Sequence, residues 1–483
     1  MKTQNILFGL CLIFFSFSSV QGQEKWSLEQ CILHAQKASI LVNQSQIGIS
    51  QAKVDLNQAK QNQLPNLSAN SGVNWNFGRT VDPTTNEFIT NTFFSNNYGV
   101  SAGLSLYNGL QIRNSVKQAQ VELEASESDL QQTIQTVSLT VANNFLTVLF
   151  NQDNIKIAER NLQLDQQQLD QLEKSIRAGT MPAAERLNIE AQIAQSEQTL
   201  ISARNDLDIA ILQLKQSLRL DPSYPLELDI PETVPYSTDP DQVTFEEAFA
   251  EAIKNRPDLR AAELRIQSAL IGTKIAKGGL APRVTIGGSL GTAYSNQGIN
   301  ILGFEESIVS QDVELTVSES PVNWDRIDAV VGLTSFDAIT EKAKYTDQLD
   351  QNLSYGFGAS ISIPIYNNGS TRANVQRAEL AEQSAQLNYD QTIENLKIAV
   401  QQALADARAL KKRYDASNKA VDAQQLAFDN ATKRLEIGAT NTFEWEAQRT
   451  QLERAQITNL IDKYNYLFNI KILEFYLGKP LKL

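Results

Sequence analysis

The two halves of the chain repeat one order of sequence patterns: a helical stretch, two alternating segments, and a much longer helical stretch. Residues 104–109, Leu-Ser-Leu-Tyr-Asn-Gly, return at 363–369 as Ile-Pro-Ile-Tyr-Asn-Asn-Gly. Later in each half, a glycine interrupts a long helical pattern, at Gly179 and again at Gly438. A chain of 483 residues would otherwise suggest several domains, but this repeat predicts one fold built from two copies.

The repeat also sets the expected boundaries. Residues 1–22 begin with a basic residue, continue with an apolar run and end with small residues, as a secretory signal peptide does, so the mature chain is expected to begin near Gln23. The first copy then covers 23–222 and the second covers 242–483. Between them, residues 223–241 form a proline-rich linker that follows no regular pattern.

Long helices are predicted where each copy lacks proline for nearly 70 residues, over 111–178 and over 370–437. Each would be roughly 100 Å long if it were continuous. In the first, two apolar stripes at helical spacing run beside a wholly polar arc that contains Thr136, Thr140 and Asn143. This pattern fits a helix in a wall that is wetted on one face, although an ordinary bundle helix would show it too.

Four segments alternate between apolar and polar residues, at 67–77, 97–107, 284–294 and 353–363. Each has about the length of a tilted strand that crosses an outer membrane. A soluble sheet also alternates, but the polar set here consists of Ser, Gly, Asn and Thr without a charge, which is typical of a water-lined lumen. Since four strands cannot close a barrel in lipid, several chains are expected to contribute to one barrel.

The connection between the second pair of strands, 295–351, is predicted to be a long acidic loop, because it contains eleven acidic and three basic residues. Loops of this length are usually functional or mobile. On the side of the membrane away from the helices, this loop could shield the mouth of a pore, bind divalent ions loosely, or have no measurable role.

Other kinds of chemistry find no support in the sequence. With 55 acidic and 42 basic residues, the net charge of −13 argues against nucleic acid as a partner. Once the signal peptide is removed, Cys31 is the single cysteine and His34 the single histidine, and the chain shows no metal-ligand spacing, phosphate loop or nucleophile triad. We therefore predict no catalytic residue, no metal, no cofactor and no enzymatic activity.

The order and spacing of these features resemble those of the TolC-like outer membrane efflux proteins. The residues that carry the resemblance are Asn-Arg-Pro-Asp-Leu at 255–259, the strand-to-helix corner Tyr-Asn-Asn-Gly at 366–369, and the two helix-tip glycines. The resemblance covers almost all of the mature chain. It implies an α+β membrane protein, a homotrimer whose four strands per chain form a twelve-stranded β-barrel in outer membrane lipid, continued into the periplasm by an α-helical barrel.

The same resemblance implies a function and partners. The chain would be the exit channel of a tripartite efflux or type I secretion system, conducting substrates passively from periplasm to exterior, with a periplasmic adaptor protein and an inner-membrane pump. From the residues alone, a secreted structural or adhesive coiled-coil protein without a pore stays open. An enzyme of the cell envelope is opposed by the missing catalytic site.

The resemblance also directs attention to the acidic residues after the tip glycines. Family members narrow their periplasmic entrance with acidic side chains there. Glu444 matches the first such position and Ala447 the next, with Glu446 beside it, and Glu185 is the counterpart in the first copy. Threefold symmetry would gather three such carboxylates around one axis, where they would attract cations. The helix dipole alone also favours a Glu at a helix start, and this simpler account is preferred for Glu185.

The turn residues at the helix tips are candidates for docking of the adaptor, because small exposed residues let another helical hairpin approach closely. The glycines could equally serve only as helix C-caps. The candidates are Ala178, Gly179, Thr180, Ile437, Gly438 and Ala439.

Overall fold

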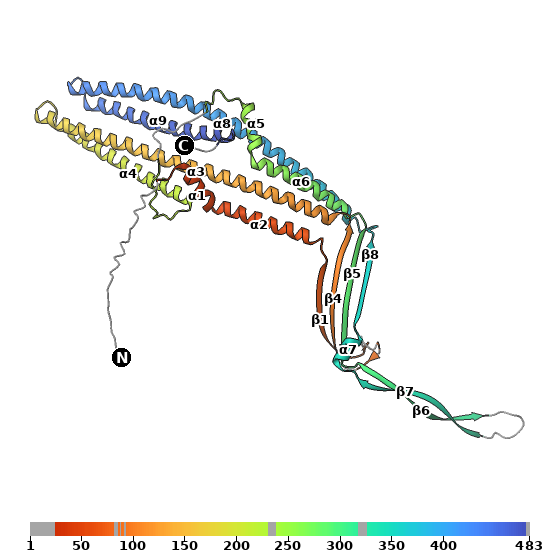
Figure 1. The fold of residues 1–483 in the computed structure, drawn as a ribbon. Helices are drawn as coiled ribbons and strands as arrows, with labels where there is room; N and C mark the ends of the chain where they lie inside the picture. Colours follow the sequence, from red (N-terminus) through yellow and green to blue (C-terminus); the bar gives the residue numbers. More distant parts are fainter. Residues whose placement is uncertain are drawn as a thin grey trace, which may run out of the picture. The chain divides into compact units, whose positions relative to one another are not determined.

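The computed structural model describes residues 25–81, 86, 88–90, 93–229, 238–316 and 326–479, so the predicted signal peptide lies outside the described residues. The chain forms two compact units (Figure 1). The first holds most of the helical residues, and the second holds the strands. The first comprises Met1–Val54, Gln120–Ser268 and Ala381–Leu483, and the second Asp55–Ala119 and Ala269–Leu380.

The helices occur as two matching sets. The first set is α1 (Leu28–Ala38), α2 (Ile40–Gln61), α3 (Gln111–Arg177) and α4 (Glu185–Leu218), and the second is α5 (Phe245–Asn255), α6 (Pro257–Gly278), α8 (Ser370–Glu436) and α9 (Thr442–Tyr476). Their lengths agree pair by pair: 11 and 11, 22 and 22, 67 and 67, and 34 and 35 residues. The duplication read from the sequence therefore extends to every helix of the repeat.

The short first helix of each set begins with the same capping arrangement. Ser27 and Gln30 form a capping box at α1, and Thr244 and Glu247 form one at α5. In each, a hydroxyl oxygen accepts from the backbone of the third residue while that residue's side chain accepts from the cap, so two otherwise unpaired N–H groups are satisfied. Pro257 follows at the first position of α6, where its missing N–H costs nothing.

The main core of the helical unit lies around the middle of α3. Val141, Phe145 and Val148 of α3 are fully buried against α1 and α4. The polar arc of the same helix, with Thr136, Thr140 and Asn143, stays exposed. Among the described helices, α3 alone contains a stretch long and apolar enough by composition to cross a membrane, but much of that stretch forms this core.

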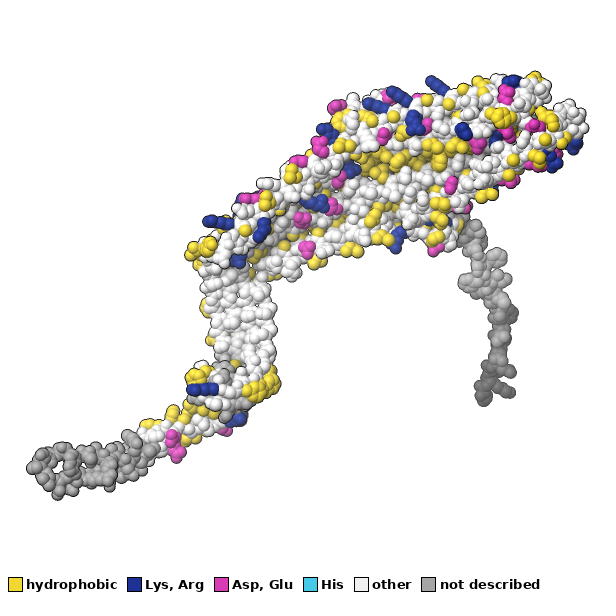
Figure 2. Space-filling view, turned by 180° about the vertical axis from the view of Figure 1, so that it is seen from behind, with side chains coloured by type: hydrophobic (Ala, Val, Ile, Leu, Met, Phe, Trp, Pro, Cys, Tyr) yellow, Lys and Arg dark blue, Asp and Glu magenta, His cyan; other side chains and the backbone are white. Residues whose placement is uncertain are grey.

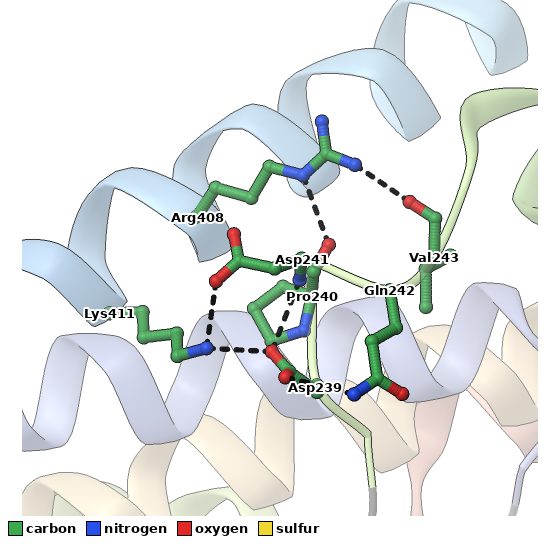
Figure 3. Close-up of polar contacts among 7 residues, drawn as sticks. All are labelled: Asp239, Pro240, Asp241, Gln242, Val243, Arg408 and Lys411. Carbon is green, nitrogen blue, oxygen red and sulfur yellow. Dashed lines mark hydrogen bonds and ion pairs between the residues drawn. The ribbon is translucent and has the colours of Figure 1, made fainter.

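The end of the proline-rich linker is fixed to α8 by two cations (Figure 3). The Lys411 ammonium donates to the carboxylates of Asp239 and Asp241, both at 2.7 Å. One turn earlier, the Arg408 guanidinium donates to two backbone carbonyl oxygens, those of Pro240 (3.0 Å) and Val243 (2.8 Å). These bonds hold the start of the second copy against its own long helix.

The strand unit contains one four-stranded antiparallel sheet in the order β1-β4-β5-β8. The strands of the two copies meet where β4 pairs with β5. Within the described part of the chain, the outer edges of β1 and β8 have no partner strand. The strands are β1 (Asn66–Asn76), β4 (Phe93–Asn108), β5 (Arg283–Ser295) and β8 (Ser354–Ser362), and a short pair, β2 (Thr80–Val81) and β3 (Phe88–Ile89), lies between β1 and β4 in sequence.

The strand register aligns the alternation of all four strands. One row of the sheet reads Val100, Leu290 and Tyr355, and its neighbours on the same face are also largely apolar and exposed. The opposite face is made mostly of Ser, Gly, Asn and Thr, with Arg283 at its end. On it, Ser68 is bonded to Ser101 (2.8 Å) and Thr285 to Ser360 (2.7 Å). Figure 2 shows the sheet as a surface almost without charged side chains.

Glycines on the polar face make room for asparagines of the neighbouring strand. A Cβ on Gly99 would lie 2.8 Å from Oδ1 of Asn70, and a Cβ on Gly103 would lie 2.8 Å from Oδ1 of Asn66. Each asparagine side chain therefore lies over a glycine across the strand boundary. The arrangement lines the polar face with amides while keeping the strands closely paired.

The segment 295–351, predicted to be a loop, is mostly regular structure. It contains β6 (Ile299–Thr316) and β7 (Arg326–Lys342), which pair with each other as a two-stranded ribbon, followed by the short helix α7 (Tyr345–Gln351). The prediction of a loop is therefore wrong for most of this segment. A β-bulge between Ile301 and Gly303 interrupts the alternation that would have revealed β6 in the sequence.

Candidate gate at the helix tips

The two long helical hairpins of the helical unit close with the same turn. In the first, Gly179 has a φ of +73° and the N–H of Thr180 donates to the carbonyl of Ser175 at 3.0 Å. In the second, Gly438 has a φ of +70° and the N–H of Ala439 donates to the carbonyl of Arg434 at 2.8 Å. This pattern is the Schellman motif, in which a left-handed glycine ends the helix. Both glycines thus act as caps.

The turns differ in what they expose. In the first turn, Ala178, Gly179 and Thr180 are exposed and small. In the second, Ile437 is 80% exposed, and Phe443, the second residue of α9, is also 80% exposed. Phe443 was not among the residues predicted to dock a partner. The second tip therefore presents the larger apolar surface.

Glu444 is held inside its own turn. Its backbone N–H donates to Oδ1 of the N-cap residue Asn441 at 2.8 Å, and its carboxylate lies 3.0 Å from the guanidinium of Arg434 and accepts from the hydroxyl of Thr440. The Thr440 hydrogen bond, and then the Arg434 charge, hold the pKa of Glu444 below its ordinary value. In a single chain, the charge of Glu444 is thus compensated locally.

Glu185 and Glu446 form a second acidic group at the tips, away from that cation. The hydroxyl of Thr442, the first residue of α9, donates to Oε2 of Glu185 at 2.7 Å, so the starts of α4 and α9 are bonded to each other. Glu446 is half-buried. Burial raises its pKa, Asp165 and Glu185 raise it further, and Arg449 opposes them. The structure therefore brings two of the three predicted acidic residues together and places Glu444 apart with its own cation.

A buried ionic cluster below the tips was not predicted. Arg449 of α9 and Asp165 of α3 are 2% and 1% exposed, and Nε of Arg449 lies 2.8 Å from Oδ1 of Asp165. Ser196 of α4 donates to Oδ2 of Asp165 at 2.6 Å and accepts from Nη2 of Arg449 at 3.1 Å. Burial raises the pKa of Asp165, and the Ser196 hydrogen bond and the Arg449 charge oppose that shift.

The sequence did contain a signal for this cluster. Arg449 continues the helical spacing of the buried residues Trp445 and Leu452, and Asp165 lies one turn from the buried Asn161. A charged residue in register with a buried stripe indicates an internal partner. What the sequence could not show is that the partner lies in the other copy.

Residues typical of metal sites do not gather in the described part of the chain. No group of three or more His, Cys, Asp or Glu in that part could hold a metal ion. Cys31 of α1 is buried in the main core of the helical unit, and burial raises the pKa of its thiol to about 12. His34 packs edge-on against Trp26, with 5.1 Å between the ring centroids.

Comparison with known proteins gives the family. A family model described as "Outer membrane efflux protein" matches residues 34–218 and 248–479. The chain is 22% identical over 447 residues to outer membrane efflux protein BepC of Brucella suis, an alignment that covers 92% of this chain and 84% of BepC. It is 24% identical over 243 residues to outer membrane protein TolC of Escherichia coli, an alignment that covers 49% of each.

The fold agrees with a solved structure of the same kind. The outer membrane protein VceC of Vibrio cholerae superposes with a TM-score of 0.72 at 17% sequence identity, covering 94% of this chain and 96% of VceC. The family is one of outer membrane channel proteins and not of enzymes, which confirms the resemblance predicted from the sequence. The chain belongs to the outer membrane efflux protein family, and its location is the outer membrane.

Proposed function

We propose that three copies of this chain form one channel that lets solutes leave the periplasm passively. The observation that carries the proposal is the four-stranded sheet, which has one apolar face and one polar face that is uncharged except for Arg283 at its end. Within the described residues, the outer edges of β1 and β8 have no partner strand. Free edges cannot remain unpaired in lipid. Pairing β1 of one copy with β8 of the next closes twelve strands, with the apolar face toward lipid and the Ser, Gly, Asn and Thr face around water.

The helices would continue this channel into the periplasm. The exposed polar arc of α3 supports this assignment, because a helix in the wall of a water-filled tunnel needs one wetted face. No residue of the chain supplies energy in this account. A pump in the inner membrane would supply it, and an adaptor would connect the pump to the exposed tip residues Ala178, Gly179, Thr180, Ile437, Gly438 and Ala439.

The entrance of the tunnel is assigned to the acidic residues at the tips. Glu446 and Glu185 would give the entrance its net negative charge, because Glu185 is held by a neutral hydroxyl and the cation that acts on Glu446, Arg449, is already paired with Asp165. Glu444 would contribute less, since Arg434 lies against it. An entrance of this kind would admit cations more readily than anions.

The test of the channel is electrical. The purified protein, reconstituted in a planar lipid bilayer, is expected to give stepwise currents without any nucleotide or partner protein, and heat-denatured protein serves as the control. The same preparation should need detergent to stay in solution. A detergent-free soluble protein that gives no current at any voltage would overturn the proposal.

A further inference from the structure

The β6–β7 ribbon belongs to the strand unit but is not used by the proposed barrel. Its strands contain 18 and 17 residues, and across the described residues they pair only with each other. A two-stranded ribbon alone is marginally stable in water and needs a further layer against one face. The side chains described on the ribbon, at 299–308 and 334–342, show which face that is.

One face of the ribbon is apolar. Paired residues share a face in an antiparallel ribbon, and residues two apart along a strand do as well. By the observed register this face also carries two charged residues, Glu306 opposite Phe336 and Lys342 opposite Ile299. Its large apolar members are Ile299, Ile301, Phe304, Ile308 and Phe336. All five are exposed, with 48, 59, 64, 74 and 67% of their surface accessible. Figure 2 shows hydrophobic side chains along this stretch.

The opposite face is mostly acidic and hydroxylic, with Ile339 as its large apolar residue. It carries Glu305 opposite Asp337 and Ser307 opposite Ser335, and the Ser307 hydroxyl donates to the Asp337 carboxylate at 3.0 Å. Nearer the sheet, Glu341 continues the same face. This face therefore suits water, while the apolar face does not.

The bulge is what produces the apolar face. Ile301 and Phe304 are three residues apart, so in a regular strand they would lie on opposite faces. The extra residue, Leu302, has no partner, and the register shift brings Ile301 and Phe304 to the same side. Without this shift the apolar residues would be divided between the two faces.

A buried glutamine fixes the base of the ribbon to the sheet. Gln348 of α7 is 3% exposed. Its amide donates to the carbonyls of Ser295 (2.9 Å) and Ala343 (3.1 Å), and its oxygen accepts from the N–H of Ser295 (2.9 Å). Ser295 precedes β6 and Ala343 follows β7, so one side chain holds both ends of the ribbon at the end of β5.

We propose that the apolar face of the β6–β7 ribbon is a self-association surface, on which the ribbons of neighbouring copies of this chain pack against one another. This inference rests on the proposed trimer, because three ribbons that each rise from the end of their own β5 would then surround one axis. The acidic faces would point outward into water. The packed ribbons would extend the wall of the channel beyond the membrane.

Charge argues for this occupant over a lipid surface. Over 299–308 and 334–342, where the side chains are described, the ribbon carries Glu305, Glu306, Asp337 and Glu341 against the single cation Lys342. Anionic headgroups would be repelled by this balance. A second copy of the same face offers apolar side chains with less repulsion, since three of these four acidic residues lie on the other face and Glu306 alone lies on this one.

Cysteine crosslinking of the full-length protein in detergent or membranes tests the inference. The variant Phe336→Cys is treated with a short bismaleimide, and Ser335→Cys, its neighbour on the opposite face, is the matched control. Cys31 is fully buried and is not expected to react. Phe336→Cys is expected to give roughly tenfold more covalent dimer and trimer than Ser335→Cys, because packing raises the effective concentration of the thiols.

A second variant shows whether the apolar contact itself is responsible. Phe304→Asp together with Phe336→Asp should strongly reduce crosslinking of an Ile308→Cys reporter, while the heat-sensitive trimer band on a gel persists. Equal crosslinking on both faces would overturn the self-association surface. So would a nitroxide label at Phe336→Cys that is relaxed by lipid-soluble quenchers, because the face would then contact lipid. Neither result would overturn the proposed trimer. Absence of the trimer band in the unmodified protein would instead overturn the proposed trimer on which it rests.

Discussion

Nε of Arg449 lies 2.8 Å from Oδ1 of Asp165, both side chains are almost fully buried, and the two residues come from different copies of the repeat. Ser196 bonds to both, so three helices, α3, α4 and α9, meet at one ion pair. A buried ion pair is weak support for stability by itself, because desolvation offsets much of the attraction. Its clearest consequence is positional: it fixes the two hairpins to each other just below the candidate entrance.

Removing one partner of this pair should therefore loosen the tips. Arg449→Leu leaves Asp165 buried without a cation, and such a change typically costs about 3–5 kcal/mol. The double variant Arg449→Leu with Asp165→Leu removes both charges and should recover most of that loss. Hydrogen exchange of α4 and α9 measures the effect. If the single and double variants exchange alike, the ion pair does not hold the hairpins together.

The acidic tip residues should control ion passage. Glu444→Ala with Glu446→Ala is expected to raise single-channel conductance or lower cation preference, by a factor on the order of two to five, because exposed charges act with about 1 kcal/mol or less. Arg434→Ala should act in the opposite direction by freeing the charge of Glu444. Glu394→Ala, an exposed acid on α8 far in sequence from the tip, is the control. Unchanged current and selectivity in the tip variants would remove the gate assignment.

The turn around Gly438 should lose protection from amide exchange only at acidic pH. The folded pKa of Glu444 is lowered, so its contribution is present above the ordinary glutamate value of about 4.3 and is lost as the pH falls through the lower, folded value. Amide exchange at residues 437–444, corrected for intrinsic rates, should stay constant from neutral pH down to about pH 4.3, the ordinary glutamate pKa, and rise below it. Arg434→Gln should shift the rise to higher pH. A rise beginning near pH 6 would contradict the contacts described.

The apolar tip should matter for adaptor binding and not for folding. Ile437→Glu places a charge on a side chain that is 80% exposed, so thermal stability should change little, whereas affinity for the adaptor should fall about tenfold or more. The control is Lys419→Glu, at an exposed residue of α8 away from the tip, and this variant should bind the adaptor normally. Equal binding of both variants in a pull-down or by interferometry would exclude this tip from the docking surface.

The duplicated strand-to-helix corners give an internal comparison. Gly109 and Gly369 have φ values of +67° and +76°, but a Cβ on Gly109 would lie 2.1 Å from the backbone oxygen of Gly278, and a Cβ on Gly369 would meet nothing within 4 Å. Gly369→Ala should cost only the conformational strain, about 1–2 kcal/mol. Gly109→Ala adds a backbone clash and should abolish assembly. Comparable yields of folded protein from the two variants would contradict the packing of this corner.

The sequence predicted those elements whose pattern is local. Proline-free helical periodicity located α3 and α8 to within a residue, and alternation located the four sheet strands. The ribbon was missed because the bulge at Leu302 breaks the period of two and because acidic and serine residues there resemble a loop. The buried pair of Arg449 and Asp165 was missed for a different reason: two helices far apart in sequence meet there, and periodicity describes one helix at a time.

The central claim is that one chain supplies a third of a closed wall, and the number of copies in each particle tests it most directly. Native mass spectrometry of the detergent-solubilised protein is expected to give three copies. A cysteine pair introduced on the outer edges of β1 and β8, which have no partner strand among the described residues, should crosslink between copies. A particle with a single copy that is soluble without detergent and has its sheet edges covered by its own chain would contradict the account.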